Sequence, residues 1–162
     1  MHCLRSAIFI GLLAATVANA QELKGFGMWK VSDLKTIEAQ LDHEIRPDHS
    51  ARRTLGDYGN HRVRLIHRVG TGAPEFHGNF ADLWIVESGQ GTLVVGGTLV
   101  DAKPLSGEET LPGDMTGTSI RGGDHRQMAA GDIVHVPPNT PHQAIVPAGG
   151  QITYIRIAIP VR

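Results

Sequence analysis

Two blocks of the sequence bring together side chains that are able to bind a metal ion. The first block spans residues 72–89 and the second spans residues 131–142. Their candidate metal ligands are His77, Asn79, Asp82 and His142. Two imidazoles and one carboxylate on an open site form a facial triad, which non-haem Fe(II) uses and which also suits Mn, Ni or Zn. We therefore expect a divalent metal ion here, with Asn79 as a weak oxygen ligand or as the holder of a metal-bound water.

The second block has the more specific spacing of the two. It resembles the second sequence motif of the cupin superfamily, which reads as a Gly, five residues, Pro-x-Gly, two residues and a His. Gly131, Pro137, Asn139 and His142 stand at these positions, with Asn139 in place of the second Gly. The resemblance implies that His142 is the last metal ligand of such a protein.

The first block resembles the first cupin motif, which reads as a Gly, a His-x-His pair, a Glu, six residues and a Gly. Asp82, six residues and Gly89 keep the last spacing, and His77 would be the first ligand. The sequence departs from the motif in two places, because Asn79 replaces the second His and Asp82 takes the Glu position one residue early. His77 and Asn79 would share one face of a strand, so Asn79 is expected to border the site.

The resemblance covers roughly residues 62–157 and implies a fold rather than a reaction. That fold is all-β, a double-stranded β-helix or jelly-roll barrel, here of the small single-domain type with a conserved type-2 barrel. Cupins pair their barrels, so the resemblance also implies a homodimer. Their functions run from dioxygenases, isomerases and lyases to sugar binders and storage proteins.

Three functions are compatible with these residues. The first is a metal-dependent oxygenase, isomerase or lyase that acts on a small organic molecule. The second is a module that binds a small acid or a sugar without turnover, and the third is a structural cupin whose metal site has decayed. The retained His77, Asp82 and His142 favour the first function, whereas Asn79 favours the others. With 15 basic and 16 acidic residues the net charge is −1, which argues against nucleic acid as a partner.

Three candidate groups for proton transfer lie beside the two blocks: Glu75, His67 and His135. His67 is expected on the apolar face of its strand, looking into the barrel, where a histidine is more often a hydrogen-bonded core residue than a catalytic one. His135 is expected either beside the site or on the outer face of its strand. Arg156 has the side chain to clamp a substrate carboxylate, although an outward, solvated arginine is the favoured interpretation.

The elements that must position these residues are indicated by periodicity. In residues 32–41 apolar side chains recur at intervals of three and four residues. This spacing predicts a helix near 32–43 with Ser32 as its N-cap. The polar, turn-rich residues 46–61 predict a connecting segment. From residue 62 the period is two, with Gly96-Gly97 as a predicted hairpin turn. The strands are expected at 62–69, 83–87, 92–95, 98–100, 116–121, 125–128, 133–136, 142–146 and 152–159.

The first twenty residues have the layout of a secretory signal peptide. Arg5 precedes the apolar run AIFIGLLAATVA, and Ala18-Asn19-Ala20 matches the small-x-small pattern of a cleavage site. The alternative is an N-terminal membrane anchor that is never cut. Cleavage after Ala20 predicts a secreted or periplasmic protein, free of the membrane and without the single Cys3. The expected organisation is a signal peptide at 1–20, a helix and connecting segment at 21–61, and a cupin barrel at 62–162.

Overall fold

The computed structural model describes residues 23–107 and 110–161 of the chain. The predicted signal peptide at residues 1–20 lies outside these ranges. Within them, no helix is long and apolar enough to cross a membrane.

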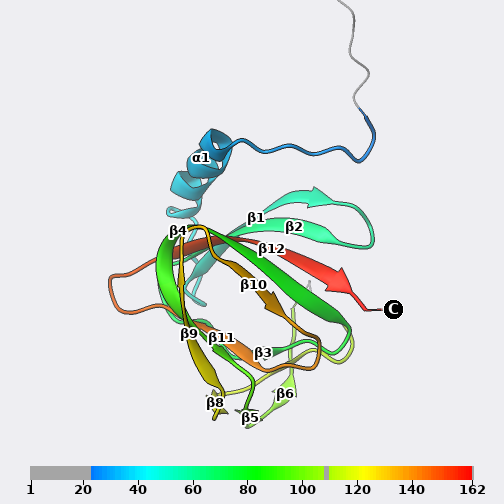
Figure 1. Ribbon diagram of the computed structural model, residues 1–162, viewed down its shortest axis with the longest axis vertical. Coiled ribbons are helices and arrows are strands. Elements are labelled where there is room, and N and C mark those ends of the chain that lie inside the picture. The colour runs from blue at the N-terminus through cyan, green and yellow to red at the C-terminus, as the bar shows by residue number, and fades with distance from the viewer. Residues whose placement is uncertain (1–22, 108–109, 162) are drawn as a thin grey trace, which may run out of the picture.

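One helix, α1, spans Val31–Leu41 and covers the barrel from outside (Figure 1). It begins one residue earlier than predicted, and Lys30 rather than Ser32 is its N-cap. The carboxylate of Asp33 accepts the backbone N–H of Lys30 at 3.1 Å, which satisfies a free donor of the first turn. Leu34 and Leu41 are buried, as the three-and-four spacing predicted.

Twelve strands make up the remainder of the described structure. They are β1 (Ser50–Asp57), β2 (Arg62–Arg68), β3 (Glu75–Phe76), β4 (Phe80–Val95), β5 (Thr98–Val100), β6 (Lys103–Pro104), β7 (Met115–Thr116), β8 (Ser119–Arg121), β9 (Asp124–Ala129), β10 (Ile133–Val136), β11 (His142–Ile145) and β12 (Ile152–Pro160). Ten of them form one antiparallel sheet that wraps into a barrel, and β5 pairs with β8 apart from it (Figure 1). The predicted all-β jelly-roll barrel with a short N-terminal helix is confirmed.

Strand β4 holds the barrel together because it continues through residues 88–91, which separate the two strands predicted at 83–87 and 92–95. Its first half pairs with β12 and β10, and its second half pairs with β9 and β11. The register against β12 shifts between Thr153 and Tyr154, close to Gly89. Gly89 has φ +71°, and a Cβ there would lie 2.1 Å from the carbonyl oxygen of Gln151. A glycine is therefore needed where β4 bends from one side of the barrel to the other.

The connecting segment predicted at residues 46–61 contains a strand, so that expectation is corrected. β1 pairs with β2 from Ser50↔Arg68 to Asp57↔Arg62. The segment is polar because one of its faces turns to the interior cavity, where arginines gather. Ala51 on its other face packs under α1. Polarity alone therefore missed a strand that pairs with the next strand of the chain, across the short turn at residues 58–61.

Gly96-Gly97 does not close the predicted hairpin, and Gly122-Gly123, which lies between the strands predicted at 116–121 and 125–128, closes none either. Val95 pairs with Asp124, and Thr98 pairs with Arg121. A Cβ on Gly97 would lie 2.6 Å from the carbonyl oxygen of Arg121, so Gly96-Gly97 faces Gly122-Gly123 across one bent ribbon. Short-range turn rules assign such pairs to separate hairpins because they do not see the opposing strand.

Two apolar cores lie on opposite faces of the sheet. Leu65 of β2 packs with Leu34 and Leu41 beneath α1, whereas Ile66 belongs to the core inside the barrel. The period-two alternation of β2 was correct, but the face with Leu65 and His67 turns to the helix. The opposite face, which carries more charge, lines the interior.

Candidate metal centre

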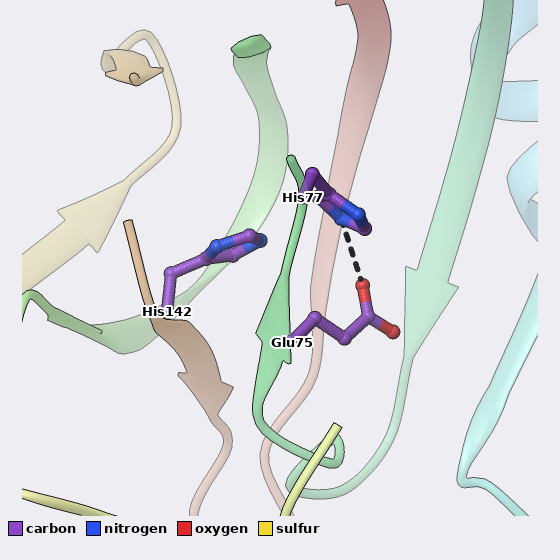
Figure 2. Close-up of side chains that lie close together, drawn as sticks. All are labelled: Glu75, His77 and His142. Carbon is purple, nitrogen blue, oxygen red and sulfur yellow. Dashed lines mark ion pairs between the residues drawn. The ribbon is translucent and has the colours of Figure 1, made fainter. Parts of the chain in front are cut away.

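Three of the predicted metal ligands converge inside the barrel, and Glu75 joins them. The Nε2 atom of His142 lies 3.5 Å from Oδ2 of Asp82, and Nε2 of His77 lies 3.7 Å from the same oxygen. Oε2 of Glu75 lies 3.4 Å from Nε2 of His77. Figure 2 shows the rings of His77 and His142 and the Glu75 carboxylate turned toward one region, where one donor atom from each lies within 4.8 Å of the others.

Each ligand is positioned by a strand or strand end of the barrel. Asp82 lies in β4, paired with Val136 of β10 on one side and Ala158 of β12 on the other. His142 opens β11 and pairs directly with Glu75 of β3. His77 follows β3 immediately, and the N–H of Asn139 donates to its carbonyl oxygen at 2.8 Å. The second block of the sequence is thereby tied to the first.

The Nδ1 atoms of the two histidines face away from the centre, and that of His142 is hydrogen-bonded whereas that of His77 only contacts a carboxylate without hydrogen-bond geometry. Nδ1–H of His142 donates to the carbonyl oxygen of Thr140 at 3.0 Å. Nδ1 of His77 lies 3.2 Å from Oδ1 of Asp114, which is buried and whose other oxygen accepts the N–H of Leu111. With Nδ1 protonated, the lone pair of Nε2 points into the centre, as metal ligation by histidine requires.

Asp114 is a residue of the site that sequence reasoning missed. It immediately precedes β7, away from both motif blocks, and no pattern in its neighbourhood marks it. A carboxylate behind a ligating imidazole fixes the ring and raises its basicity. Only the fold, which places Asp114 behind His77, identifies it.

The charges of the centre favour ionised carboxylates. Burial of Glu75 opposes its ionisation, but the neighbouring His77 imidazole and the charge on Arg156 lower the pKa of Glu75 to about 2. Burial likewise opposes ionisation of Asp82, and Arg156 and His142 outweigh it, so the pKa of Asp82 lies well below its usual range. Burial of His142 disfavours its charged form, but Asp82 and Glu75 raise its pKa above 6.5.

Arg156 also faces this centre, which corrects the favoured expectation of an outward, solvated side chain. Its Nη2 lies 2.8 Å from Oδ1 of Asp82 and 3.3 Å from Nε2 of His77. It shares a face of β12 with Ile152 and Tyr154, both of which belong to the interior core. Because β12 is covered on both sides, alternation alone could not decide which of its faces is solvated.

The donor set fits a divalent metal ion. Nε2 of His142 and Oδ2 of Asp82 are buried and have no hydrogen-bond partner of good geometry among the described residues. Buried polar atoms are rarely left in this state. Two imidazole nitrogens and two carboxylates are ligands that Mn, Fe, Ni and Zn accept. The guanidinium of Arg156 is the one group that opposes a cation there.

Asn79 lies outside the cluster, contrary to the expectation that it borders the site. Strand β3 ends at Phe76, so His77 and Asn79 do not share a strand face. Asn79 is exposed, and its side-chain amide donates to the carbonyl oxygen of Pro112. The pair of the first block that faces the centre is Glu75 and His77, with Asp82 following after four residues. The pair of candidate ligands therefore starts two residues earlier than the resemblance to the first motif placed it.

The structure does not bring the other two proton-transfer candidates to the cluster. His67 is buried beneath α1, where its Nδ1 lies 2.8 Å from Oγ1 of Thr153 and its Nε2 3.5 Å from Oδ1 of Asp42. The expectation that it looks into the barrel is corrected, because the helix covers that face. His135 is exposed on β10, opposite Leu83. Of the three candidates, Glu75 alone lies at the centre.

Comparison with known proteins supports the fold. No protein-family model matches the sequence, and no curated protein matches it. Among solved structures, the TT1209 protein of Thermus thermophilus is 13% identical, with a TM-score of 0.51 over 72% of this chain and 88% of that one. A cupin-2 domain protein of Rhodospirillum rubrum is 18% identical, with a TM-score of 0.49 over 70% and 62%. The polyketide cyclase RemF of Streptomyces resistomycificus is 15% identical, with a TM-score of 0.47 over 68% and 64%.

The structural neighbours include cupin-type proteins, among them cupin-2 domains and enzymes. This chain spans less than two thirds of the length of the cyclase and of the Rhodospirillum rubrum protein. At these identities the likeness concerns the fold alone. The chemistry must be argued from the side chains of this barrel.

Proposed function

We propose that this chain is a cupin that binds a divalent metal ion and acts on a small organic molecule. The observation that supports it best is the convergence of His77 and His142, whose Nε2 atoms lie 3.7 Å and 3.5 Å from Oδ2 of Asp82 while their Nδ1 atoms face the Asp114 carboxylate and the Thr140 carbonyl. Glu75 and Asp82 complete the donor set. A structural histidine needs no such arrangement, whereas a metal ligand does.

A bound divalent ion would supply Lewis acidity toward a substrate oxygen. The residues of the chain do the rest. Asp82 keeps Arg156 beside the centre, and the low pKa of Glu75 leaves it ionised at neutral pH, able to ligate or to accept a proton. Trp84 stacks on Tyr154 with ring centroids 4.7 Å apart, and both residues line the cavity beside the centre.

The alternative is a binding module without turnover, and Arg156 is the observation that favours it. Its guanidinium already neutralises Asp82, so the cluster is electrostatically satisfied in part without a metal. Such a module would bind its small molecule equally well before and after a chelator has removed any metal ion. A metal-dependent protein would lose its ligand, its activity or both when the ion is removed.

The experiment that tests the proposal uses a protein that starts at residue 21. Its melting temperature is measured after metal has been removed with a chelator and again after metal has been added. Adding Mn²⁺, Fe²⁺, Ni²⁺ or Zn²⁺ to the chelated protein is expected to raise its melting temperature, because a ligand of the native state stabilises it. His77→Ala and His142→Ala should abolish the rise. His135→Ala, which removes an exposed imidazole from β10, is the matched control and should retain it. A rise that survives in all three variants would contradict the proposal.

Secretion and dimerisation belong to the same proposal. Secretion to the periplasm or the medium is supported by the apolar run before Ala20 and by the cleavage pattern there. Dimerisation is supported by β1, which ends the strand order and so has one edge to offer, and by the exposed apolar side chains of Phe26 and Val31 nearby in the chain.

A further inference from the structure

Arginine is concentrated in the cavity beside the metal centre. Four arginines line this cavity, together with a single carboxylate, Glu75; they are Arg52, Arg64, Arg68 and Arg156. The chain as a whole carries a net charge of −1, so this positive charge is local rather than a property of the composition. A low-dielectric cavity with an excess of one sign concentrates ions of the other.

Two of these arginines stand directly opposite each other. Arg64 of β2 pairs in register with Arg156 of β12, and only 7% of Arg64 is exposed. Like charges in directly opposed positions destabilise a sheet, and burying charge is costly as well. Asp82 offsets part of this cost at Arg156. An anion placed between the two guanidiniums would be attracted by both and would weaken their mutual repulsion.

A further donor is turned to the same cavity from Arg68. Its Nε–H donates to the hydroxyl of Tyr154 at 3.2 Å, while Nη1 is buried without a hydrogen-bond partner among the described residues. A Cβ at residue 72 would lie 2.5 Å from that Nη1, so Gly72 leaves the space in which the guanidinium sits. The cavity therefore holds a charged donor that a ligand is able to satisfy.

A second, larger cavity shares Arg64 and Arg156 with the first and extends outward. Its volume is about 190 Å³, against about 50 Å³ for the inner cavity. Its apolar walls come from Phe80, Leu111, Ala158 and Pro160. A molecule that fills both would place a small charged end between the arginines and an apolar body against these walls.

We propose that this double cavity binds an organic monocarboxylate, with its carboxylate on Arg64, Arg68 and Arg156 and its body in the outer cavity. The inference rests on the proposed function, because it names the class of small molecule that the same site takes. A carboxylate fits better than a phosphate, since the inner cavity is small and the ionised Glu75 and Asp82 repel a dianion. Bidentate pairing with a guanidinium is the geometry that recognises a carboxylate.

The probes are benzoate and benzamide, which have nearly the same shape and differ in charge. Benzoate is expected to raise the melting temperature of the wild-type chain, and the rise should shrink as the NaCl concentration increases. Benzamide is expected to leave the melting temperature unchanged. An equal effect of the two probes, or no effect of benzoate, would overturn the inference without reference to any variant.

Two variants locate the binding site. Arg64→Gln should weaken benzoate binding by about tenfold or more, consistent with the loss of a charge-assisted hydrogen bond. Leu111→Glu places a negative charge on the wall of the outer cavity, at a half-exposed position whose replacement spares the core, and should weaken binding too. Arg126→Gln, which alters an exposed arginine of β9, is the control and should bind as the wild type does. Unchanged affinity in Leu111→Glu would overturn the placement even where Arg64→Gln fails to fold.

Metal content, measured on the same samples, separates the two proposals. Benzoate binding in a chain that takes up no metal would leave the anion site standing and remove the metal-dependent function. Metal binding without any response to benzoate would remove the anion site alone.

Discussion

The Nε2 atoms of two imidazoles face one centre in this barrel, and a polar group lies behind each ring. The Thr140 carbonyl accepts a hydrogen bond from His142, whereas the Asp114 carboxylate lies 3.2 Å from Nδ1 of His77 without hydrogen-bond geometry. A substitution is able to remove the Asp114 carboxylate, whereas the Thr140 carbonyl belongs to the backbone and remains in any variant. The contribution of ring orientation to metal binding is therefore testable at His77.

Asp114→Asn is expected to lower metal affinity by about 10- to 100-fold while the fold persists, since the carboxylate fixes the tautomer and basicity of His77. A calorimetric titration of the metal-free protein with Mn²⁺ measures the change in metal affinity. Asp124→Asn removes an exposed carboxylate from the Arg126 ion pair and serves as the control. Equal affinities in the two variants would show that Asp114 does not support the ligand.

The metal-free protein is expected to lose stability as the pH rises above neutrality. His142 has a raised pKa beside Asp82, so its protonated form is favoured in the folded state. That contribution is fully present below the unfolded pKa of about 6.5 and is lost as the pH rises through the higher folded value. Urea unfolding from pH 6 to pH 9 should show the decline in wild type and a smaller one in His142→Gln. A parallel decline in both proteins would assign it to other groups.

How far the sequence predicts the site depends on whether a residue belongs to a motif. His77, Asp82 and His142 were predicted because the two blocks place them at strand ends that the barrel brings together. Asn79 was wrong because the alternation rule was applied beyond the end of β3. Asp114 could not be predicted, since its partner is defined by the fold rather than by spacing.

For the strands, the sequence predicts the two-residue alternation more securely than it predicts which side of a strand faces the interior. The alternation in β2 and β12 was recognised, yet the interior face of each was the one that carries arginine. Burial on both sides removes the usual contrast between an apolar inner face and a polar outer face. The strand β1 was missed because its polar side chains are divided between the two sides: Arg52 lines the inner cavity, whereas Arg53 pairs with Glu44 at the surface.

Gly89→Ala is expected to destabilise the protein at the bend of β4. The substitution places a Cβ 2.1 Å from the carbonyl oxygen of Gln151 at a residue with φ +71°. Gly96→Ala is the matched control, because Gly96 has φ +82° but no atom within 4 Å of the added Cβ. The control should lose about 1 kcal/mol from backbone strain alone, and Gly89→Ala should lose clearly more. Equal losses in urea unfolding would show that the close approach of β12 costs nothing.

The segment before α1 exposes several apolar side chains, although Trp29 packs against the core beneath the helix. Leu23, Phe26 and Met28 of this segment, and Val31 at the start of α1, are each more than 60% exposed. In Figure 1 this stretch runs outside the barrel, beyond α1. Together with the open edge of β1, it is the surface that the proposed dimer would cover.

Phe26→Asp is therefore expected to shift the chain from dimer toward monomer, because a charge would be buried at the interface. Light scattering at several protein concentrations measures the mass. Ile133→Asp alters an equally exposed apolar residue on β10 and should leave the dimer intact. A wild-type chain of monomer mass at all concentrations would exclude the dimer outright.

The central claim is that His77, His142 and the two carboxylates beside them hold one metal ion. Elemental analysis of the chain from residue 21, purified without added metal or chelator, tests it most directly. We expect close to one divalent ion per chain in the wild type and in His135→Ala, and almost none in His142→Ala. A wild-type chain that contains no metal and takes none up on dialysis, or a His142→Ala chain with undiminished content, would contradict it.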